Sequence, residues 1–156
     1  KRLDMFKIEV IVRNIAAGSL VKKYGFKEGA PLEKPIITMD FKSDAQHDPM
    51  INDDIAIALH LATKKELNQI REISLKVDAA LARYLEQRNL LLPDFKIEFG
   101  KFKRKILVGD EISPDSCRFW DKATRKSLDK DVFRFDKGDL ISAYEEVARR
   151  IVPEIF

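Results

Sequence analysis

The sequence predicts an α+β fold in which a mixed or antiparallel sheet packs against helices. Residues 94–99 alternate charged and apolar side chains with the period of two that is typical of a strand. Thr63 and Glu66 have the spacing of a helix capping box, and apolar residues follow at three- and four-residue steps. Strands and helices do not alternate strictly, as a doubly wound sheet would require, so α+β fits better than α/β.

The first third of the chain predicts two strands, a short helix and two loops. Asn14 is a plausible N-cap for the helix and Gly25 a plausible end, while Gly29, Pro31 and Pro35 indicate a loop. In order, we expect a strand over 6–13, a helix over 14–25, a loop over 26–35, a strand over 35–41 and a loop over 42–52.

The rest of the chain predicts a long helix, a hairpin and a final helix. The long helix runs from Thr63 to about Asn89, with an apolar stripe of Leu67, Ile70, Ile73, Val77, Leu81 and Tyr84. A charged β-hairpin follows in "DFKIEFGKFKRKILVGDEISPD", residues 94–115. Residues 113–116 then read as a turn, 117–121 as a short extended piece and 139–151 as an amphipathic helix.

Composition is that of one globular domain. The chain has 156 residues, of which 45% are hydrophobic and 35% charged, enough for one core. The net charge of +3 comes from 29 basic and 26 acidic residues, a weak and mixed bias that suits an anionic small molecule about as well as nucleic acid. The single cysteine excludes an internal disulfide and favours a cytoplasmic location, and no apolar run is long enough to span a membrane.

The charged face of the hairpin permits two interpretations. Asp94, Lys96 and Glu98 alternate with apolar neighbours, and Asp110 on the return strand is expected near Lys96 and Glu98. Glu98 and Asp110 then have the oxygen ligands that Mg²⁺ prefers, with Lys96 as a point charge for a phosphate or carboxylate. The alternative is a cross-strand salt bridge on a solvated sheet face.

Two arginines are candidate anion ligands. Arg13 ends a predicted strand, Ser19 lies in the helix that follows, and the small residues between them allow a ligand to approach the backbone. The alternative is an ordinary strand-to-helix turn with an exposed arginine. Arg118 follows a turn and precedes Trp120, so it is either a second phosphate ligand or a partner that stacks on an aromatic ring. Cys117 reads as a small packed residue, because no base neighbours it in sequence.

Other motifs are weak or missing. His47 and Asp48 suggest a metal, but zinc spacing is absent, and Asp48 before Pro49 is equally a turn former. The chain has six glycines and neither a Walker-type loop nor a dinucleotide glycine pattern. Any nucleotide would therefore be bound outside these motifs.

Taken together, the motifs resemble SAICAR synthetase, phosphoribosylaminoimidazole-succinocarboxamide synthase. The stretches "VRNIAAGSL", "HDPM", "DFKIEFG", "GDEISPDSCRFWD" and "DKDVFR" occur in that family's order and spacing. The resemblance implies an ATP- and Mg²⁺-dependent ligase of purine biosynthesis. Such an enzyme joins L-aspartate to the carboxylate of CAIR, a carboxylated aminoimidazole ribonucleotide, through an acyl phosphate.

The resemblance also implies roles for individual residues. Glu98 and Asp110 would be the metal carboxylates, and Lys96, Asp110 and Asp48 would act near the reacting groups. The CAIR phosphate would be gripped by Arg13, Ser19 and Arg118. ATP would bind along the segment of Met5 and Glu9, with the backbone at Met5 facing adenine.

The sequence departs from the family in three respects. The family's N-terminal lobe, kinase-like or ATP-grasp-like and carrying lysines for the ATP phosphates, is not represented. We therefore expect one domain over 1–156, a hinge segment plus the substrate- and metal-binding lobe, inactive alone. Lys7 stands where proline is frequent, and Cys117 where serine or glycine is common. A homo-oligomer is compatible with these features.

Two other functions remain open. A kinase-like phosphotransferase lobe shares a related fold, but the expected phosphate clamp argues against it. A nucleic-acid-binding module is indicated only by the mild basic charge, and the sequence lacks aromatic residues interleaved on a basic strand face. We therefore expect small-molecule substrates and neither nucleic acid nor a membrane as partner.

Overall fold

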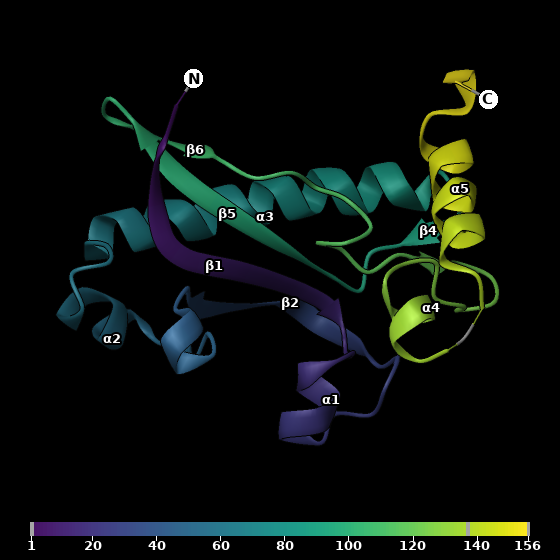
Figure 1. Ribbon diagram of the computed structural model, residues 1–156, viewed down its shortest axis with the longest axis horizontal. Helices are drawn as coiled ribbons and strands as arrows, with labels where there is room; N and C mark the ends of the chain where they lie inside the picture. Colours follow the sequence, from purple (N-terminus) through teal and green to yellow (C-terminus); the bar gives the residue numbers. More distant parts are fainter. Residues whose placement is uncertain (1, 137, 156) are drawn as a thin grey trace.

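The fold is built on an antiparallel sheet of five strands. The computed structural model describes residues 2–136 and 138–155, and its sheet has the order β3-β2-β1-β5-β6, with every neighbouring pair antiparallel (Figure 1). The strands are β1 (Asp4–Ile15), β2 (Pro31–Phe41), β3 (Met50–Ile51), β5 (Asp94–Phe102) and β6 (Lys105–Val108). The predicted α+β class is confirmed, and the sheet is antiparallel throughout.

The central strand β1 separates the core from a charged face. Its residues Phe6, Ile8, Val10 and Val12 are buried in the hydrophobic core together with residues of α3. The side chains between them point to the opposite face, because successive residues of a strand alternate sides. Glu9 is paired in register with Glu98 of β5, and Arg13 with Asp94. The alternation seen in the sequence therefore places charges from two strands side by side.

The long helix α3 (Lys64–Glu86) covers the core face of the sheet (Figure 1). The predicted capping box is confirmed, since the Thr63 side chain accepts from the Glu66 amide and Glu66 reaches back to the Thr63 amide. Leu67 and Ile70 are fully buried against the sheet. Tyr84, at the end of the predicted stripe, is 39% exposed, and its hydroxyl donates to the Ile151 carbonyl.

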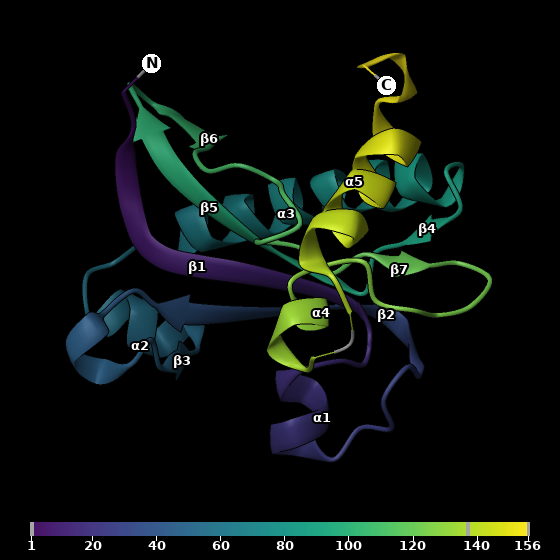
Figure 2. The ribbon, with the colours of Figure 1, turned by 45° about the vertical axis from the view of Figure 1, so that its right-hand side comes forward.

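The remaining elements lie around this core. Helices α1 (Ser19–Tyr24) and α4 (Asp131–Arg134) lie near each other beside one end of β1, and α5 (Leu140–Ile151) stands near the C-terminal end of α3 (Figure 2). The other elements are α2 (Asp53–Ala58), the 3₁₀ turns Asp44–Gln46 and Pro153–Ile155, and a small sheet of β4 (Leu90–Leu91) and β7 (Trp120–Asp121). No helix within the described ranges is both long enough and apolar enough to cross a bilayer.

The structure corrects the predicted start of the first helix. Asn14 does not cap a helix but belongs to β1, and its side-chain amide donates to Asp78 at 2.7 Å. The helix begins at Ser19, after Gly18, whose φ of 53° lies in the left-handed region that favours glycine. The backbone pairing of β1 with its neighbours outweighs the capping tendency of asparagine. Gly25 does end the helix, in the left-handed conformation.

Two other predicted boundaries, those of the second strand and of the loop after it, differ from the structure. The second strand begins at Pro31 rather than at residue 35, because the chain already pairs there with Ile15. Residues 42–52 are not entirely loop, since Met50 and Ile51 form the edge strand β3. The expected hairpin is present, and its turn lies at Lys103 and Arg104, between the paired residues Phe102 and Lys105.

Candidate functional site

A cleft of about 610 Å³ opens on the charged face of the sheet. Its floor is formed by the outward-facing side chains of β1 and β5, and its walls by α1 and by the segment around α4. The lining includes Glu9, Ile11, Arg13, Gly18, Ser19, Lys22, Lys23, Asp40, Asp94, Lys96, Ser116, Arg118, Lys130, Asp131, Arg134 and Phe135. Elements far apart in the sequence thus bring charges of both signs together.

At one end of the cleft the two candidate arginines meet on one carboxylate. Arg13 Nη1 lies 3.3 Å from Asp94 Oδ2, and Arg118 Nη1 donates to both Asp94 oxygens at 2.9 and 2.7 Å. Arg13 Nη2 donates to Ser19 Oγ at 2.9 Å. Arg13, Ser19 and Arg118 are therefore brought together, as the sequence predicts. Arg118 is engaged by carboxylates and not by the ring of Trp120.

This end of the cleft is buried and retains an unpaired donor. Arg13 is 6% exposed and Asp94 4%. Arg13 Nε is buried without a hydrogen-bond partner among the described residues. Burial lowers the pKa of Arg13 and outweighs the opposing effect of Asp94. A buried donor without a partner is costly to the fold.

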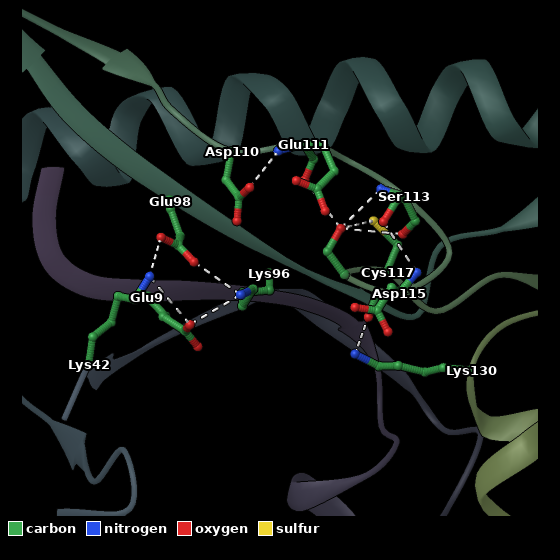
Figure 3. A network of polar contacts seen from close by, with 11 residues as sticks. Glu9, Lys42, Lys96, Glu98, Asp110, Glu111, Ser113, Asp115, Cys117 and Lys130 are labelled. Atoms are coloured by element: carbon green, nitrogen blue, oxygen red, sulfur yellow. Dashed lines mark hydrogen bonds and ion pairs between the residues drawn. The ribbon is translucent and has the colours of Figure 1, made fainter. Parts of the chain in front are cut away.

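Further along the floor, two lysines hold two glutamates (Figure 3). Lys96 Nζ lies 3.1 Å from Glu9 Oε1 and 3.0 Å from Glu98 Oε1, and Lys42 Nζ lies 2.5 Å from Glu98 Oε2. Burial by itself lowers the pKa of Lys96, but its hydrogen bonds to Glu98 and Glu9 outweigh that effect and raise it. Lys96 is therefore a fixed positive charge at neutral pH.

Asp110 lies at the edge of this group, just after β6. The Glu111 amide donates to Asp110 Oδ1 at 3.0 Å, and Gly109 continues the pairing with a bond to the Glu98 carbonyl. Hydrogen bonding with Glu111 lowers the pKa of Asp110, with smaller contributions from a hydrogen bond to Glu98 and from the charge of Lys96. The predicted proximity of Asp110 to Lys96 and Glu98 is thus confirmed. The alternative of a salt bridge also agrees in part, since Glu98 is paired with Lys42 and Lys96, but Glu98 is only 4% exposed and so does not lie on a solvated face.

The carboxylates of Glu98 and Asp110 are the candidate ligands for a divalent cation. Across the described part of the chain, no group of three or more His, Cys, Asp or Glu residues is placed to hold a metal. Mg²⁺ often binds through only one or two protein carboxylates and completes its shell with water and phosphates. Glu98 and Asp110 fit that donor set, although both oxygens of Glu98 already contact lysines.

Four predicted residues lie outside the cleft lining, namely Glu98 and Asp110 beside it and Asp48 and Met5 elsewhere. Asp48 is exposed, has a φ of 47°, and accepts a hydrogen bond from the Ser43 amide at 2.8 Å, which is the turn-forming role considered for it. Met5 instead lines a second cleft of about 370 Å³ with Lys7, His60 and Lys101. Cys117 is 1% exposed, and burial raises the pKa of its thiol to about 11, so it is a packed residue.

Several lining residues were not singled out from the sequence. Asp40 lies opposite Glu9 in the β1–β2 pairing, and the alternation in "PIITMDF" carries that information once the register is known. Lys42, which lies beside the lining rather than in it, directly follows β2, and its contact with Glu98 depends on strand order. The other cationic lining residues are Lys22, Lys23, Lys130 and Arg134. Lys22 and Lys23 lie on α1, whereas Lys130 and Arg134 lie at the two ends of α4, and nothing local in the sequence joins the two pairs.

The fold and the site define an α+β protein with a charged cleft on one sheet face, and comparisons with known proteins place it in a family. SAICAR synthetase is the family that matches, over residues 1–151. Phosphoribosylaminoimidazole-succinocarboxamide synthase of Methanosarcina acetivorans is 60% identical over 156 residues, which is 100% of this chain and 66% of that protein. The enzyme of the same name from Pyrococcus abyssi is 56% identical over 155 residues, 99% of this chain and 66% of its own length.

Solved structures agree with this match. A SAICAR synthetase in complex with ADP superposes with a TM-score of 0.95 and 52% identity, over 97% of this chain and 65% of that one. SAICAR synthetase from Pyrococcus horikoshii gives a TM-score of 0.94 and 53% identity, over 97% of this chain and 67% of that one. The chain belongs to the SAICAR synthetase family. It spans about 66% of the length of the first relatives named above.

Proposed function

We propose that this chain forms part of an ATP-dependent ligase, which joins L-aspartate to the carboxylate of CAIR and forms SAICAR. Family membership supports this proposal, because its relatives are named for that synthase activity. The observation that carries it is the two-part cleft. Arg13, Ser19 and Arg118 converge at one end, and Lys96 and the carboxylates gather further along the floor.

The arginine end suits the phosphate of CAIR. Guanidinium groups offer planar pairs of donors to phosphate oxygens, and the Ser19 hydroxyl adds another polar group beside them. Lys22, Lys23, Lys130 and Arg134 surround the same space and add positive charge. A dianionic monoester placed here would meet an excess of cations.

The lysine–glutamate end suits activation of the CAIR carboxylate. In the proposed first step, a carboxylate oxygen bonds to the γ-phosphorus of ATP while the bond to ADP breaks. In the second step, the aspartate amine bonds to the acyl carbon and loses a proton. The bond between the acyl carbon and the phosphate oxygen breaks, and inorganic phosphate leaves. Fixed charges such as Lys96 act by stabilising the charge that develops in both steps.

Mg²⁺ and ATP belong to the same proposal. Glu98 and Asp110 would hold the cation, which would supply charge neutralisation for phosphate oxygens. A related SAICAR synthetase was solved with ADP, which supports nucleotide binding by analogy. We assign the nucleotide to the side of Met5 and Glu9, and Asp48 to the substrate region, as the resemblance implies.

The domain assignment is also proposed. The 156 residues would form the substrate- and metal-binding lobe, with the rest of the relatives' length supplying a second lobe for the ATP phosphates. We place the enzyme in the cytoplasm, in keeping with a buried, unpaired Cys117. Its substrates would be CAIR and L-aspartate, and self-association is compatible with this assignment.

The test is a turnover assay on a protein that carries this chain within the full length of its relatives. ADP release should require CAIR, L-aspartate and Mg²⁺ together, and SAICAR should form in a one-to-one ratio with ADP. Phosphoryl transfer to a hydroxyl acceptor would favour a phosphotransferase instead. Absence of any CAIR-dependent reaction would contradict the proposal.

A further inference from the structure

We propose that Asp94 is a positioning residue that fixes the spacing and orientation of Arg13 and Arg118, so that the pair grips a phosphate monoester. This inference rests on the proposed function, because it assumes that the arginines bind a phosphorylated substrate. It assigns to Asp94 a role carried out through other residues. The groups that would touch the phosphate are the two guanidinium groups.

The first argument is the geometry of the shared carboxylate. Arg13 pairs with Asp94 in the β1–β5 register, so the two Cα atoms are held by the sheet itself. Arg118 reaches the same carboxylate from another segment, with contacts at 2.9 and 2.7 Å, and its amide donates to the Asp94 carbonyl at 2.9 Å. Asp94 therefore connects the two arginines through both its side chain and its backbone.

The second argument is that Arg118 is held on three sides. Its Nε donates to Asp131 Oδ2 at 2.7 Å, and its Nη1 is taken by Asp94. On the third side lies Gly18, where a Cβ would stand 2.5 Å from Arg118 Nη2. A larger residue at position 18 would displace the guanidinium, and the φ of 53° also disfavours one. Such a seat leaves the side chain few alternative positions.

The third argument is the depth of burial. Asp94 has a side-chain exposure of 6%, against 7% for Arg13 and 13% for Arg118. Long arginine side chains lose considerable rotamer freedom when they are fixed in one geometry. A site that fixes them before the ligand arrives leaves less ordering for binding itself, which strengthens binding. Asp131, which also pairs with Arg118, is itself paired with Arg134, so three guanidinium groups face two carboxylates and the cluster keeps a net charge of +1 that attracts an anion.

Two substitutions separate positioning from charge neutralisation. Asp94→Asn removes the charge and keeps the shape, while Asp94→Glu keeps the charge and moves the carboxylate by one methylene. The matched control is Asp53→Asn, because Asp53 also pairs with two cations, Lys64 at 2.7 Å and Arg71, and lies outside the cleft lining. Calorimetric titration of CAIR and of its dephosphorylated nucleoside into each protein gives the affinities.

Positioning predicts that both Asp94 variants bind CAIR about ten-fold more weakly or worse, while the affinity for the nucleoside and the Asp53 control change little. If Asp94 only neutralised charge, Asp94→Glu would bind like wild type and Asp94→Asn would bind the anion more tightly. Equal losses for CAIR and nucleoside would mean a structural role. Either result overturns the proposal. Should Asp94→Asn not fold, the Asp94→Glu titration decides alone.

A ligand-free measurement distinguishes failure of this inference from failure of the proposed function. Rotation of the Arg118 guanidinium can be followed by ¹⁵N side-chain NMR, with the signal assigned by its loss in Arg118→Lys. We expect slow rotation in wild type and in Asp53→Asn, and fast rotation in Asp94→Asn. If wild type shows slow rotation but does not bind CAIR, the proposal that CAIR is the substrate is refuted, whereas the positioning of Arg118 by Asp94 is retained. Unchanged rotation in Asp94→Asn would refute the positioning whatever the substrate is.

Discussion

Glu9 of β1 and Glu98 of β5 lie directly opposite each other in the sheet, and Lys96 Nζ bridges them at 3.1 and 3.0 Å. Asp40 lies opposite Glu9 on the other side, so three carboxyl groups form a row across three neighbouring strands. Like charges in directly opposed positions destabilise a sheet. Lys96, together with Lys42, pairs with Glu9 and Glu98 and so offsets the repulsion between these two members of the row.

Replacing Lys96 with methionine should destabilise the fold in a pH-dependent way. We expect Lys96→Met to lower the free energy of unfolding by on the order of 1 kcal/mol, because the pair is partly exposed. The pKa of Lys96 is raised in the folded state above its ordinary 10.5. Its contribution is therefore fully present below pH 10.5 and is lost only as the pH rises through the folded value.

Urea unfolding at a series of pH values measures this difference. The gap between wild type and Lys96→Met should stay constant up to pH 10.5 and close above it. Lys65→Met, at an exposed position of α3, is the control and should show little difference. A gap that closes near neutral pH would show that the bridge to the glutamates is not the cause.

Replacing Arg118 should weaken the binding of CAIR selectively. Lysine keeps the charge but lacks the planar donors, so we expect Arg118→Lys to cost about ten- to a hundred-fold in affinity and Arg118→Ala to cost more. The affinity for ATP should hardly change. Calorimetry on each variant gives the values, with Arg88→Lys as control, because Arg88 packs over Tyr84 away from the cleft. Equal losses for CAIR and its nucleoside would assign Arg118 to the fold.

Replacing Asp110 should affect catalysis more than stability. Asp110 is partly exposed and the substitution keeps its shape, so Asp110→Asn should leave the melting temperature nearly unchanged. In a protein of the relatives' full length, we expect the Mg²⁺-dependent rate to fall by about ten-fold or more, because one anionic ligand is lost. Glu145→Gln, an exposed carboxylate of α5, is the control. An unaltered Mg²⁺ titration would leave Asp110 as a surface charge.

The core should be sensitive where α3 meets the sheet. Ile70 is fully buried, so Ile70→Ala should cost about 2–5 kcal/mol of unfolding free energy. Leu75, on the same helix, is 43% exposed, and Leu75→Ala should cost far less. Chemical denaturation of both variants tests the assignment. Similar losses at the two positions would contradict the packing of this helix.

The parts of the fold that the sequence predicts are those determined by local patterns. The α3 capping box and the alternation of residues 94–99 specify their elements within a few residues. The predicted start of α1 was wrong because Asn14 can either cap a helix or extend a strand. In the structure it extends β1, and its side chain donates a hydrogen bond to Asp78. The short strand β3 exists only through its partner β2, which no local pattern reveals.

The site follows the same division. Arg13, Ser19 and Arg118 were predicted through the family resemblance, and their convergence depends on a register that the residues alone do not give. The central place of Asp94 emerges only when both arginines are seen to share it. The side chain of Asp48 accepts a hydrogen bond from the Ser43 amide, and its role near the substrate stays a prediction.

The most direct test of the account is a calorimetric titration of CAIR and of its dephosphorylated nucleoside into the wild-type 156-residue chain. The account predicts that CAIR binds and that the nucleoside binds at least about ten-fold more weakly, because Arg13 and Arg118 grip the phosphate. Equal affinities for the two ligands, or no binding of CAIR, would contradict the assignment of this cleft.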